Sequence, residues 1–358
     1  MSRQIAVLVT GVGGRSIGHQ ILHALLLLHD RYRIVCCDAD SYAFGLYEVR
    51  DRYVVPSARQ DGYIGAILEV VRRHDIQVLL PGTEAEIRVL VQHRSALTEA
   101  GCLLVASPAE VIDLCADKGR LYQWLTDQQI GLPRSCGVDG WRNFATRTGY
   151  PLVAKPGRSS GGSRNVEIIA DAAEVEDYIA RFPGPPQEIV FQEYVGDASS
   201  EYTVGVIVGR NGQIIDSIVL HRHLTGLSLG TTRVIDAKHY VLSTGYSQGF
   251  IVKHPQIQGF CEDLARHMGM VGPVNIQLRL HAGEVKVFEV HPRFSGTTSI
   301  RSDVGFNEPD LVIRDHLLGE QLGRQPYRTD VAVIRAFRTI VVPMAEMQAV
   351  HSLSKTAG

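Results

Sequence analysis

Features that mark secreted, nucleic-acid-binding and membrane proteins are scarce in this 358-residue sequence. It contains only six cysteines, and no two of them form a Cys-x-x-Cys pair. Sparse, unpaired cysteines in a long chain are typical of reduced thiols in a cytosolic protein and argue against a disulfide framework. The 36 basic and 38 acidic residues nearly cancel, and no block of five like charges occurs, so bulk attraction to nucleic acid is not expected.

Long apolar runs are missing as well. Residues 5–9 are too few for the apolar core of a signal peptide, and residues 21–28 include His23 and are far too few to span a bilayer. We therefore expect a soluble, cytoplasmic protein that acts on small molecules and has no nucleic-acid or membrane partner. No motif reveals the oligomeric state, for which a homodimer is the commonest expectation.

Apolar residues, by contrast, make up 45% of the chain and supply enough material for two or three hydrophobic cores at this length. In the first 110 residues, short apolar runs alternate with helical patterns, which predicts βαβ units and a parallel sheet. The expected strands are residues 5–10, 33–38, 78–80 and 102–106, and the expected helices are residues 17–28, 63–73 and 84–93.

The middle of the chain changes character, and several strand signals follow one another, with Asn211-Gly212 as a strong hairpin signal between two of them. The predicted fold class is α/β followed by α+β. Its parts are a Rossmann-like domain (1–112), a small central lid (113–190), a core domain (191–343) and a weakly patterned tail (344–358). Further strands are expected at residues 151–155, 166–169, 189–193, 202–208, 214–220, 274–280 and 285–290, and further helices at 117–129, 254–268 and 310–318.

A first glycine cluster, Gly11-Val12-Gly13-Gly14-Arg15-Ser16-Ile17-Gly18, connects the first strand to the first helix, where phosphate-binding turns occur. The dinucleotide pattern G-x-G-x-x-G is not met because residue 16 is serine, although Asp38 lies 20 residues beyond Gly18. We favour a tight turn in a domain that binds no dinucleotide, and an NAD-dependent enzyme is the alternative.

A second glycine cluster follows a predicted strand and reads Lys155-Pro156-Gly157-Arg158-Ser159-Ser160-Gly161-Gly162-Ser163. Its backbone N–H groups and hydroxyls can close over a triphosphate, and Lys155 supplies a positive charge. The segment is not a Walker A motif, since no Gly-Lys-Ser/Thr follows at the required spacing. A solvated surface loop is the alternative interpretation.

The strongest local signal is a pair of strands, Asn275-Ile276-Gln277 and Phe288-Glu289-Val290-His291. A three-residue turn of His281, Ala282 and Gly283 would place Asn275 opposite Glu289. One face would then carry Asn275, Gln277, Glu289 and His291, and the other Val274, Ile276, Leu278, Phe288 and Val290. Clustered oxygen donors beside a phosphate site suit Mg²⁺, whereas an ordinary hairpin with a polar face is the alternative.

Two segments after this hairpin extend the predicted site. Arg293 follows at once and can neutralise charge on a transferring phosphoryl group. The run Ser295-Gly296-Thr297-Thr298 offers N–H and O–H donors to a carboxylate or an acyl phosphate.

Together these segments resemble the ATP-grasp superfamily, most closely the branch around the carbamoyl phosphate synthetase large chain, over about residues 4–320. The family motif Glu-x-Asn-Pro-Arg stands here as Glu289-Val290-His291-Pro292-Arg293. The resemblance implies a Rossmann-like pre-ATP-grasp domain followed by a two-lobed ATP-grasp fold. It also implies an ATP site with Mg²⁺, for which Mn²⁺ is an alternative.

The resemblance assigns roles to matching positions. Lys118 and Lys155 match the phosphate-binding cations, and Gln277 and Glu289 match the metal ligands. The other implied nucleotide contacts are the lid loop, the adenine hinge and the ribose-binding acid, namely Ser160, Gly161 and Gly162; Glu193, Tyr194 and Val195; and Glu201. Gln277 also counts among the nucleotide contacts.

His291 stands where the family usually has Asn or Asp. Imidazole suits softer ions better than Mg²⁺, so His291 is either a metal ligand or a phosphate contact. Candidate substrate contacts are Glu84, Arg233, Ser295, Gly296 and Thr297. Glu84 can instead simply begin a helix, where negative charge is favourable, and Arg233 can be a surface charge.

The reaction that the resemblance implies is the joining of a carboxylate to an amine. ATP would phosphorylate the carboxylate, Lys155 and Arg293 would offset the developing charge, and the amine would displace phosphate. Phosphorylation of bicarbonate or carbamate is an alternative reaction. A nucleotide-binding module without catalysis is the alternative of another class, and His291 is the feature that favours it.

Overall fold

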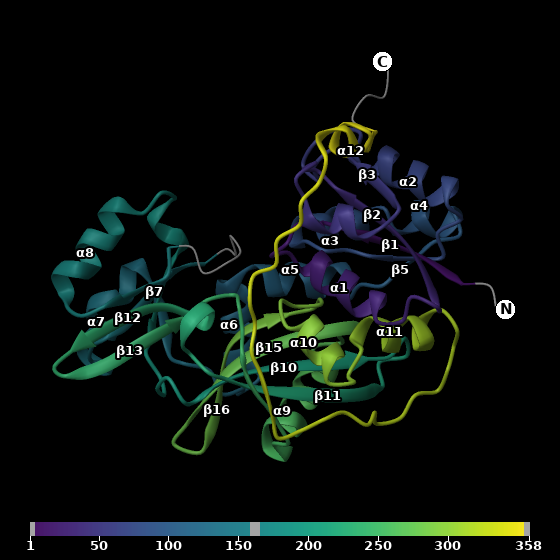
Figure 1. Cartoon of the computed structure of the whole chain (residues 1–358). Helices are drawn as coiled ribbons and strands as arrows, with labels where there is room; N and C mark the ends of the chain where they lie inside the picture. The colour runs from purple at the N-terminus through teal and green to yellow at the C-terminus, as the bar shows by residue number, and fades with distance from the viewer. Residues whose placement is uncertain (1–3, 158–164, 354–358) are drawn as a thin grey trace.

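The computed structural model describes residues 4–157 and 165–353, which form three larger sheets and a two-stranded ribbon. Figure 1 shows the N-terminal domain above the sheet of the core domain, with the central lid to the left. Within these two ranges, no helix is long and apolar enough to cross a membrane.

The N-terminal domain is a six-stranded parallel sheet with the order β18-β3-β2-β1-β4-β5. Alternate residues of the first strand pack into different apolar clusters, Ala6 and Leu8 into one, Val7 and Val9 into the other. Both faces are therefore buried, as parallel sheets require, and the predicted α/β domain is confirmed. Its elements are β1 (Ile5–Thr10), α1 (Ile17–Leu26), β2 (Tyr32–Asp38), β3 (Asp51–Val54), α2 (Tyr63–Arg73), β4 (Val78–Leu80), α3 (Glu84–Gln92), α4 (Arg94–Glu99) and β5 (Leu103–Leu104).

One edge strand of this sheet, β18, comes from the C-terminal segment. After α12 (Met344–Gln348), β18 (His351–Ser352) pairs in parallel with β3. Figure 1 shows the segment running along the outside of the molecule from the core to the N-terminal domain. The sequence suggested only a weakly patterned tail here, because two residues are too short a strand to leave a periodic signal.

The central lid is a four-stranded antiparallel sheet with the order β6-β9-β7-β8, covered by two helices. Its apolar cluster is built around Trp141, Phe144, Tyr178 and Phe191. The elements are β6 (Ser135–Gly137), α7 (Trp141–Thr148), β7 (Leu152–Pro156), β8 (Glu167–Ile169), α8 (Ala172–Arg181) and β9 (Ile189–Glu193). Two helices, α5 (Ala109–Ala116) and α6 (Lys118–Asp127), lead from the N-terminal domain into the lid.

The core domain is a six-stranded antiparallel sheet with the order β16-β15-β10-β11-β14-β17. One face packs on α9 and on the two connecting helices, and the other packs on α10, α11 and the N-terminal domain. Its strands are β10 (Glu201–Val208), β11 (Ile214–Arg222), β14 (Gly249–Val252), β15 (Gly272–His281), β16 (Glu284–His291) and β17 (Val331–Val333). Its helices are α9 (Pro255–His267), α10 (Thr298–Asp303) and α11 (Glu308–His316), and β12 (Leu229–Ile235) with β13 (Lys238–Ser243) forms the ribbon.

The turn between β15 and β16 is shorter than predicted. It has two residues, Ala282 and Gly283, both with positive φ, and His281 pairs with Glu284. Two left-handed residues in succession match the right-handed twist of the flanking strands. The prediction that Asn275 lies opposite Glu289 is therefore wrong.

A bulge in β16 compensates for the shorter turn. Phe288 is the extra residue, because Val287 pairs with Leu278 whereas Glu289 pairs with Gln277. Asn275 then lies opposite His291. Because paired residues share a face, the four polar residues still lie on one face of the hairpin, as predicted.

The division into parts at residues 112, 190 and 343 remains our proposal. The boundary after residue 190 falls inside β9, which belongs to the sheet of the lid as far as Glu193. Helices α5, α7 and α8 and strands β3, β12, β13 and β14 were not expected from the sequence patterns, since most of them are short and half-exposed.

Candidate functional site

Lys118 is the first residue of α6 and lies beside the hairpin carboxylate. Asp117 caps this helix by accepting a hydrogen bond from the N–H of Arg120, and the N–H of Lys118 donates to the carbonyl of Gly157. The start of α6 is thus tied to the start of the second glycine cluster. Lys118 Nζ is 3.6 Å from Glu289 Oε1.

Lys155 lies near the end of β7 and is only 6% exposed. Its Nζ donates to the hydroxyl of Tyr122 at 2.6 Å and to Oε1 of Gln192 at 2.7 Å. Burial lowers the pKa of Lys155 to about 7, Lys118 adds to the shift, and Glu289 opposes it. The positive charge of the Lys155 ammonium group is therefore only partly compensated by its protein neighbours.

Glu289 lies beside Lys118 and His291, and the charge of Lys155 also acts on it. Burial alone would raise the pKa of Glu289, but His291, Lys118 and Lys155 together hold it well below the usual value. The carboxylate is thus ionised, and His291 Nε2 donates a hydrogen bond to Glu289 Oε2 at 3.1 Å. With Nε2 acting as a donor, a neutral His291 keeps a lone pair only on Nδ1, which faces Glu84, so His291 as a metal ligand stays a prediction.

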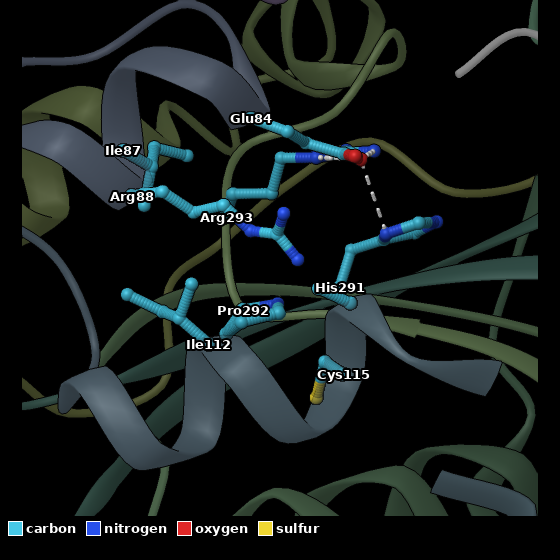
Figure 2. Close-up of a pocket in the computed structure, with 9 residues that line it drawn as sticks. Glu84, Ile87, Arg88, Ile112, Cys115, His291, Pro292 and Arg293 are labelled. Carbon is cyan, nitrogen blue, oxygen red and sulfur yellow. Dashed lines mark hydrogen bonds and ion pairs between the residues drawn. The ribbon is translucent and has the colours of Figure 1, made fainter. Parts of the chain in front are cut away.

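Arg293 reaches from the core domain to the N-terminal domain. Its Nη2 and Nε donate to Oε1 of Glu84, at 2.6 Å and 3.1 Å. Glu84 begins α3, and His291 Nδ1 lies 3.5 Å from the same oxygen (Figure 2). Arg293 holds the pKa of Glu84 down at about 2, and His291 contributes to the shift.

A small cavity of about 30 Å³ lies beside this ion pair, between α3, α5 and the end of β16. Figure 2 shows the side chain of Arg88 extending across it toward His291 and Pro292. Among the described residues, Arg88 has no hydrogen-bond or ion-pair partner. The cavity is lined by Glu84, Ile87, Arg88, Ile112, Cys115, Ala116, His291, Pro292 and Arg293.

Gln277 and Glu289 are paired across the hairpin, and both are only partly exposed. Gln277 makes no side-chain hydrogen bond within the described part of the chain, so its amide oxygen is free. Counting His, Cys, Asp and Glu alone, residues 4–157 and 165–353 contain no cluster of three that could hold a metal ion. Mg²⁺ does not need one, because it binds through one or two protein oxygens plus phosphates and waters. These two residues therefore fit Mg²⁺ together with a nucleotide.

The predicted ribose-binding acid, Glu201, is buried and 1% exposed. One oxygen accepts from Arg222 at 2.9 Å and the other from Arg279 at 2.9 Å and 3.0 Å. Both oxygens are thus occupied in the interior. This environment gives Glu201 a structural role and does not support a ribose contact.

The predicted substrate contact Arg233 is also occupied, because it pairs with Glu174 on α8 and donates to the carbonyl of Ile168. It joins the ribbon to the lid and lies apart from Arg293. The alternative of a surface charge is therefore better supported for Arg233.

The Ser-Gly-Thr run forms a closed turn before α10. The hydroxyls of Ser295 and Thr297 are buried and lie 2.6 Å apart, and the N–H of Thr297 donates to Ser295 Oγ. The carbonyl of Gly296 accepts from Arg335. Local side-chain-to-backbone bonds of this kind satisfy the turn itself. They do not support donation to a substrate, because these groups already have partners.

The three residues predicted to form the adenine hinge lie between the lid and the core. Glu193 ends β9 and accepts from the N–H and Nε of Arg134, at 2.7 Å and 2.8 Å. The hydroxyl of Tyr194 bonds to the backbone of Val241 on the ribbon, and the carbonyl of Val195 accepts from Arg279. Ser160, Gly161 and Gly162 lie outside the described residues.

The first glycine cluster serves close packing of helix on strand. A Cβ on Gly18 would lie 2.2 Å from the carbonyl oxygen of Thr10, and one on Gly82 would lie 2.0 Å from the same atom. Gly11 has φ of +61°, and a Cβ on it would collide with the side chains of Thr83 and Glu86. These contacts support the tight turn rather than a dinucleotide site.

Sequence patterns missed Tyr122 and Gln192, which hold Lys155. A signal for each was present. Tyr122 lies four residues after Lys118 on one helix face, and Gln192 is a diagonal neighbour of Lys155 on the adjacent strand. Neither pairing is visible until the helix and both strands are placed.

Comparisons with known proteins agree with this geometry. Residues 7–105 match a family described as PylC-like, N-terminal domain, and residues 187–339 match one described as ATP-grasp in the biosynthetic pathway with Ter operon. The structure is similar to N5-carboxyaminoimidazole ribonucleotide synthetase from Thermotoga maritima, with a TM-score of 0.61, 16% identity and coverage of 90% of this chain and 78% of that one. The chain has the ATP-grasp fold.

A second similar structure is the biotin carboxylase domain of the 2-oxoglutarate carboxylase from Hydrogenobacter thermophilus, solved with MgADP, ADP and bicarbonate. Its TM-score is 0.62 at 14% identity, with 89% of this chain and 70% of that one covered. In sequence, the chain is 26% identical over 333 residues to the carbamoyl phosphate synthase large chain of Rubrobacter xylanophilus, covering 88% of this chain. It spans only about 30% of the length of that relative. The predicted ATP-grasp fold is thus confirmed.

Proposed function

We propose that this chain is an ATP-dependent ligase that activates a carboxylate as an acyl phosphate and joins it to an amine, releasing ADP and phosphate. The observation that supports this most strongly is the convergence of Lys118, Lys155 and Glu289 from a helix and two different sheets. Two cations around one ionised carboxylate suit a nucleotide triphosphate bound with a divalent ion.

Each of these residues would have a distinct role. Lys155 is buried and short of counter-charge, so an arriving phosphate would stabilise its ammonium form and be bound in return. Lys118 would exchange its contact with Glu289, at 3.6 Å, for a phosphate oxygen. Glu289 and Gln277 would hold Mg²⁺, or Mn²⁺ in its place. When bound, the ion neutralises charge on the phosphates.

We propose that one polar group of the substrate enters the cavity between the N-terminal and core domains, since about 30 Å³ is too small for the whole amine and carboxylate. Arg293 would offset charge on the transferred phosphoryl group, and Glu84 would bind the amine. The unpaired guanidinium of Arg88 would bind an anionic group of the substrate, while Ile87 and Ile112 provide an apolar wall. Such a site favours an amino-acid-like or peptide-like substrate.

Phosphorylation of bicarbonate or carbamate is a second candidate. It is favoured by the similarity to carbamoyl phosphate synthase large chains and to a biotin carboxylase domain solved with bicarbonate. Amine-dependent and bicarbonate-dependent release of ADP distinguish the two candidates in one assay.

The test is to incubate the purified protein with Mg-ATP, to measure ADP and phosphate, and to add pooled carboxylates, pooled amino acids, or bicarbonate. We expect ADP release that requires both a carboxylate and an amine, and a loss of at least a hundredfold in the Glu289→Gln variant, since removing one charge-stabilising group from a preorganised site commonly lowers kcat by about that factor. Mass spectrometry of the products would identify the amide. If the protein fails to bind ATP, the proposal is wrong. If ATP binds but no pool releases ADP, the ligase reaction fails for those substrates, and the alternative of a binding module is favoured.

We also propose three properties that follow from the resemblance and from the composition of the chain. They are the adenine contacts of Glu193, Tyr194 and Val195, the cytoplasmic location, and the homodimer.

A further inference from the structure

Tyr122 lies at the junction of the helix, the lid strand and the core hairpin that carry the site. It is one turn after Lys118 on α6 and 4% exposed. Lys155 Nζ lies 2.6 Å from its hydroxyl and 4.9 Å from the centre of its ring. The same hydroxyl lies 2.8 Å from the carbonyl oxygen of Phe288.

The direction of these two hydrogen bonds follows from the chemistry of the groups. A carbonyl oxygen can only accept, so Tyr122 must donate its single hydroxyl hydrogen to Phe288. Its oxygen is then an acceptor toward Lys155, which must donate. Gln192 Oε1 takes a second hydrogen of the same amine at 2.7 Å. Lys155 is therefore held by two acceptors, and the third hydrogen of its ammonium form remains for another partner.

Phe288 is a position on which the orientation of the hairpin depends. It is the bulged residue of β16, and Glu289 follows it directly. Without the bulge, the side chain of Glu289 would point to the apolar face, since strand side chains alternate. The hydrogen bond from Tyr122 satisfies a carbonyl that the bulge removes from the regular ladder.

We propose that Tyr122 is a positioning residue for phosphate binding, which fixes Lys155 and Glu289 in one geometry through a single hydroxyl. The inference rests on the proposed function, because it assigns the third donor position of Lys155 to an ATP phosphate. It extends that function by making Tyr122 responsible for the alignment between the lid and the core. No nucleophilic or acid–base role is required of the phenol.

One consequence separates this role from simple packing. The phenol oxygen accepts from the ammonium form of Lys155, and a hydrogen bond to the charged form favours that form. Removing the hydroxyl should therefore lower the pKa of Lys155 further. Because phosphate binding needs the ammonium form, the affinity for Mg-ATP should begin to fall at a lower pH in the variant than in the wild type.

The experiment measures Mg-ATP and Mg-ADP affinity between pH 6 and pH 9 for the full chain and for Tyr122→Phe, which keeps the ring. We expect about tenfold weaker Mg-ATP binding near pH 7.5, since bonds to charged groups contribute about this factor, and a midpoint of the pH dependence displaced to lower pH. The matched control is Tyr32→Phe. Tyr32 is also buried, and its hydroxyl bonds to Asp310 at 2.7 Å, away from the site. The control should lose stability but keep the wild-type affinity and midpoint.

A double-mutant cycle with Lys155→Met covers the case in which Tyr122→Phe is weakly folded. If Tyr122 acts partly through Lys155, its substitution should change ATP affinity less in the Lys155→Met background than in the wild type, and the effect that remains is the part that acts through Phe288 and Glu289. A Tyr122→Phe protein with wild-type affinity and midpoint overturns this proposal and leaves the proposed function intact. Absence of Mg-ATP binding by the wild type overturns the proposed function, and this inference with it.

Discussion

Lys155 is a buried amine whose charge is only partly balanced in the ligand-free protein. The pKa of lysine in an unfolded chain is 10.5, whereas burial lowers the pKa of Lys155 in the folded protein to about 7. Between these values the unfolded state binds more protons than the folded state, so this group makes folding more favourable as the pH rises. Its contribution is unfavourable at pH 7 and diminishes toward pH 9.

We predict that Lys155→Met stabilises the protein near pH 7, because it removes a buried charge that lacks a full partner. The advantage should shrink by about 2 kcal/mol between pH 7 and pH 9, as the wild-type lysine loses its proton. Urea unfolding measures the free energy of unfolding of both proteins at the two pH values. In the difference between the two proteins, the contributions of all other titrating groups cancel. A stability gain that does not change with pH would show that Lys155 is not a titrating group in this range.

Arg88 provides a second test at the residue scale. If its guanidinium binds an anionic group of the substrate, Arg88→Ala should raise KM about tenfold for an amino-acid acceptor, since a charged hydrogen bond contributes about that much. KM for the corresponding amine without a carboxylate, and the affinity for ATP, should stay within twofold. Steady-state ADP release with paired acceptors measures this. The control is Arg72→Ala, an exposed arginine at the end of α2. Equal losses with both acceptors would contradict the assignment.

Three strands of the core sheet are joined by one buried group of charges. Glu201 on β10 lies between Arg222 on β11 and Arg279 on β15, and the side chains are 2%, 1% and 7% exposed. The two arginines outweigh the burial effect, so the pKa of Glu201 stays below its ordinary value. Arg279 also bonds to the carbonyls of Val195 and Val241, so the group fixes the approach to the hinge and the ribbon.

We predict that Glu201→Gln destabilises the core domain by about 3–5 kcal/mol, because it leaves two buried arginines without a counter-charge. Thermal or urea unfolding followed by tryptophan fluorescence and circular dichroism measures the loss. The control is Asp263→Asn, which breaks an exposed pair with Arg266 on α9 and should change stability by less than about 1 kcal/mol. A small effect of Glu201→Gln would favour a carboxylate that is free to contact a nucleotide.

The hairpin shows what a sequence pattern can and cannot predict at this scale. The alternation of polar and apolar residues correctly predicted that Gln277 and Glu289 lie on one face, because the apolar residues of both strands are buried on the other. It did not reveal the Ala282-Gly283 turn or the bulge at Phe288, which cancel each other's effect on the faces. Val287 consequently takes the buried position expected for Phe288. Turn and bulge depend on contacts such as the bond from Tyr122, which comes from 166 residues away.

The same limit explains the assignment of Glu201. Its distance along the chain from Glu193 matched a family pattern, but its partners Arg222 and Arg279 lie 21 and 78 residues away. Local motifs predict which residues are present near a site. Long-range pairing decides which of them are free to bind, as Gln277 is and Arg233 is not.

At the scale of the molecule, the N-terminal domain and the core domain share one apolar cluster. Val9 and Leu22 of the first belong to it together with Ile218 and Leu311 of the second. Polar contacts cross the same boundary, such as the bond from Tyr32 to Asp310 at 2.7 Å. The cavity with Glu84 and Arg293 therefore lies at a packed junction, whose shape depends on both domains being folded.

The C-terminal segment adds a second connection between these domains, and its removal is the last prediction. A chain ending at residue 343 loses the pairing of His351 with Tyr53, the bond from the N–H of Leu353 to the carbonyl of Val54 at 2.8 Å, and the ion pair of Arg52 with Glu346. A few backbone bonds and one partly buried leucine amount to about 2 kcal/mol.

Because the two domains share an apolar cluster, we expect them to unfold in a single calorimetric transition. The loss should lower the Tm of this transition by a few degrees. Scanning calorimetry of the shortened and full chains measures this, with Glu346→Gln as the control that removes only the exposed ion pair and should shift Tm by about one degree or less. Two separated transitions would show that the domains unfold independently, and the geometry of the cavity between them would then depend on a weaker interface than the shared cluster indicates.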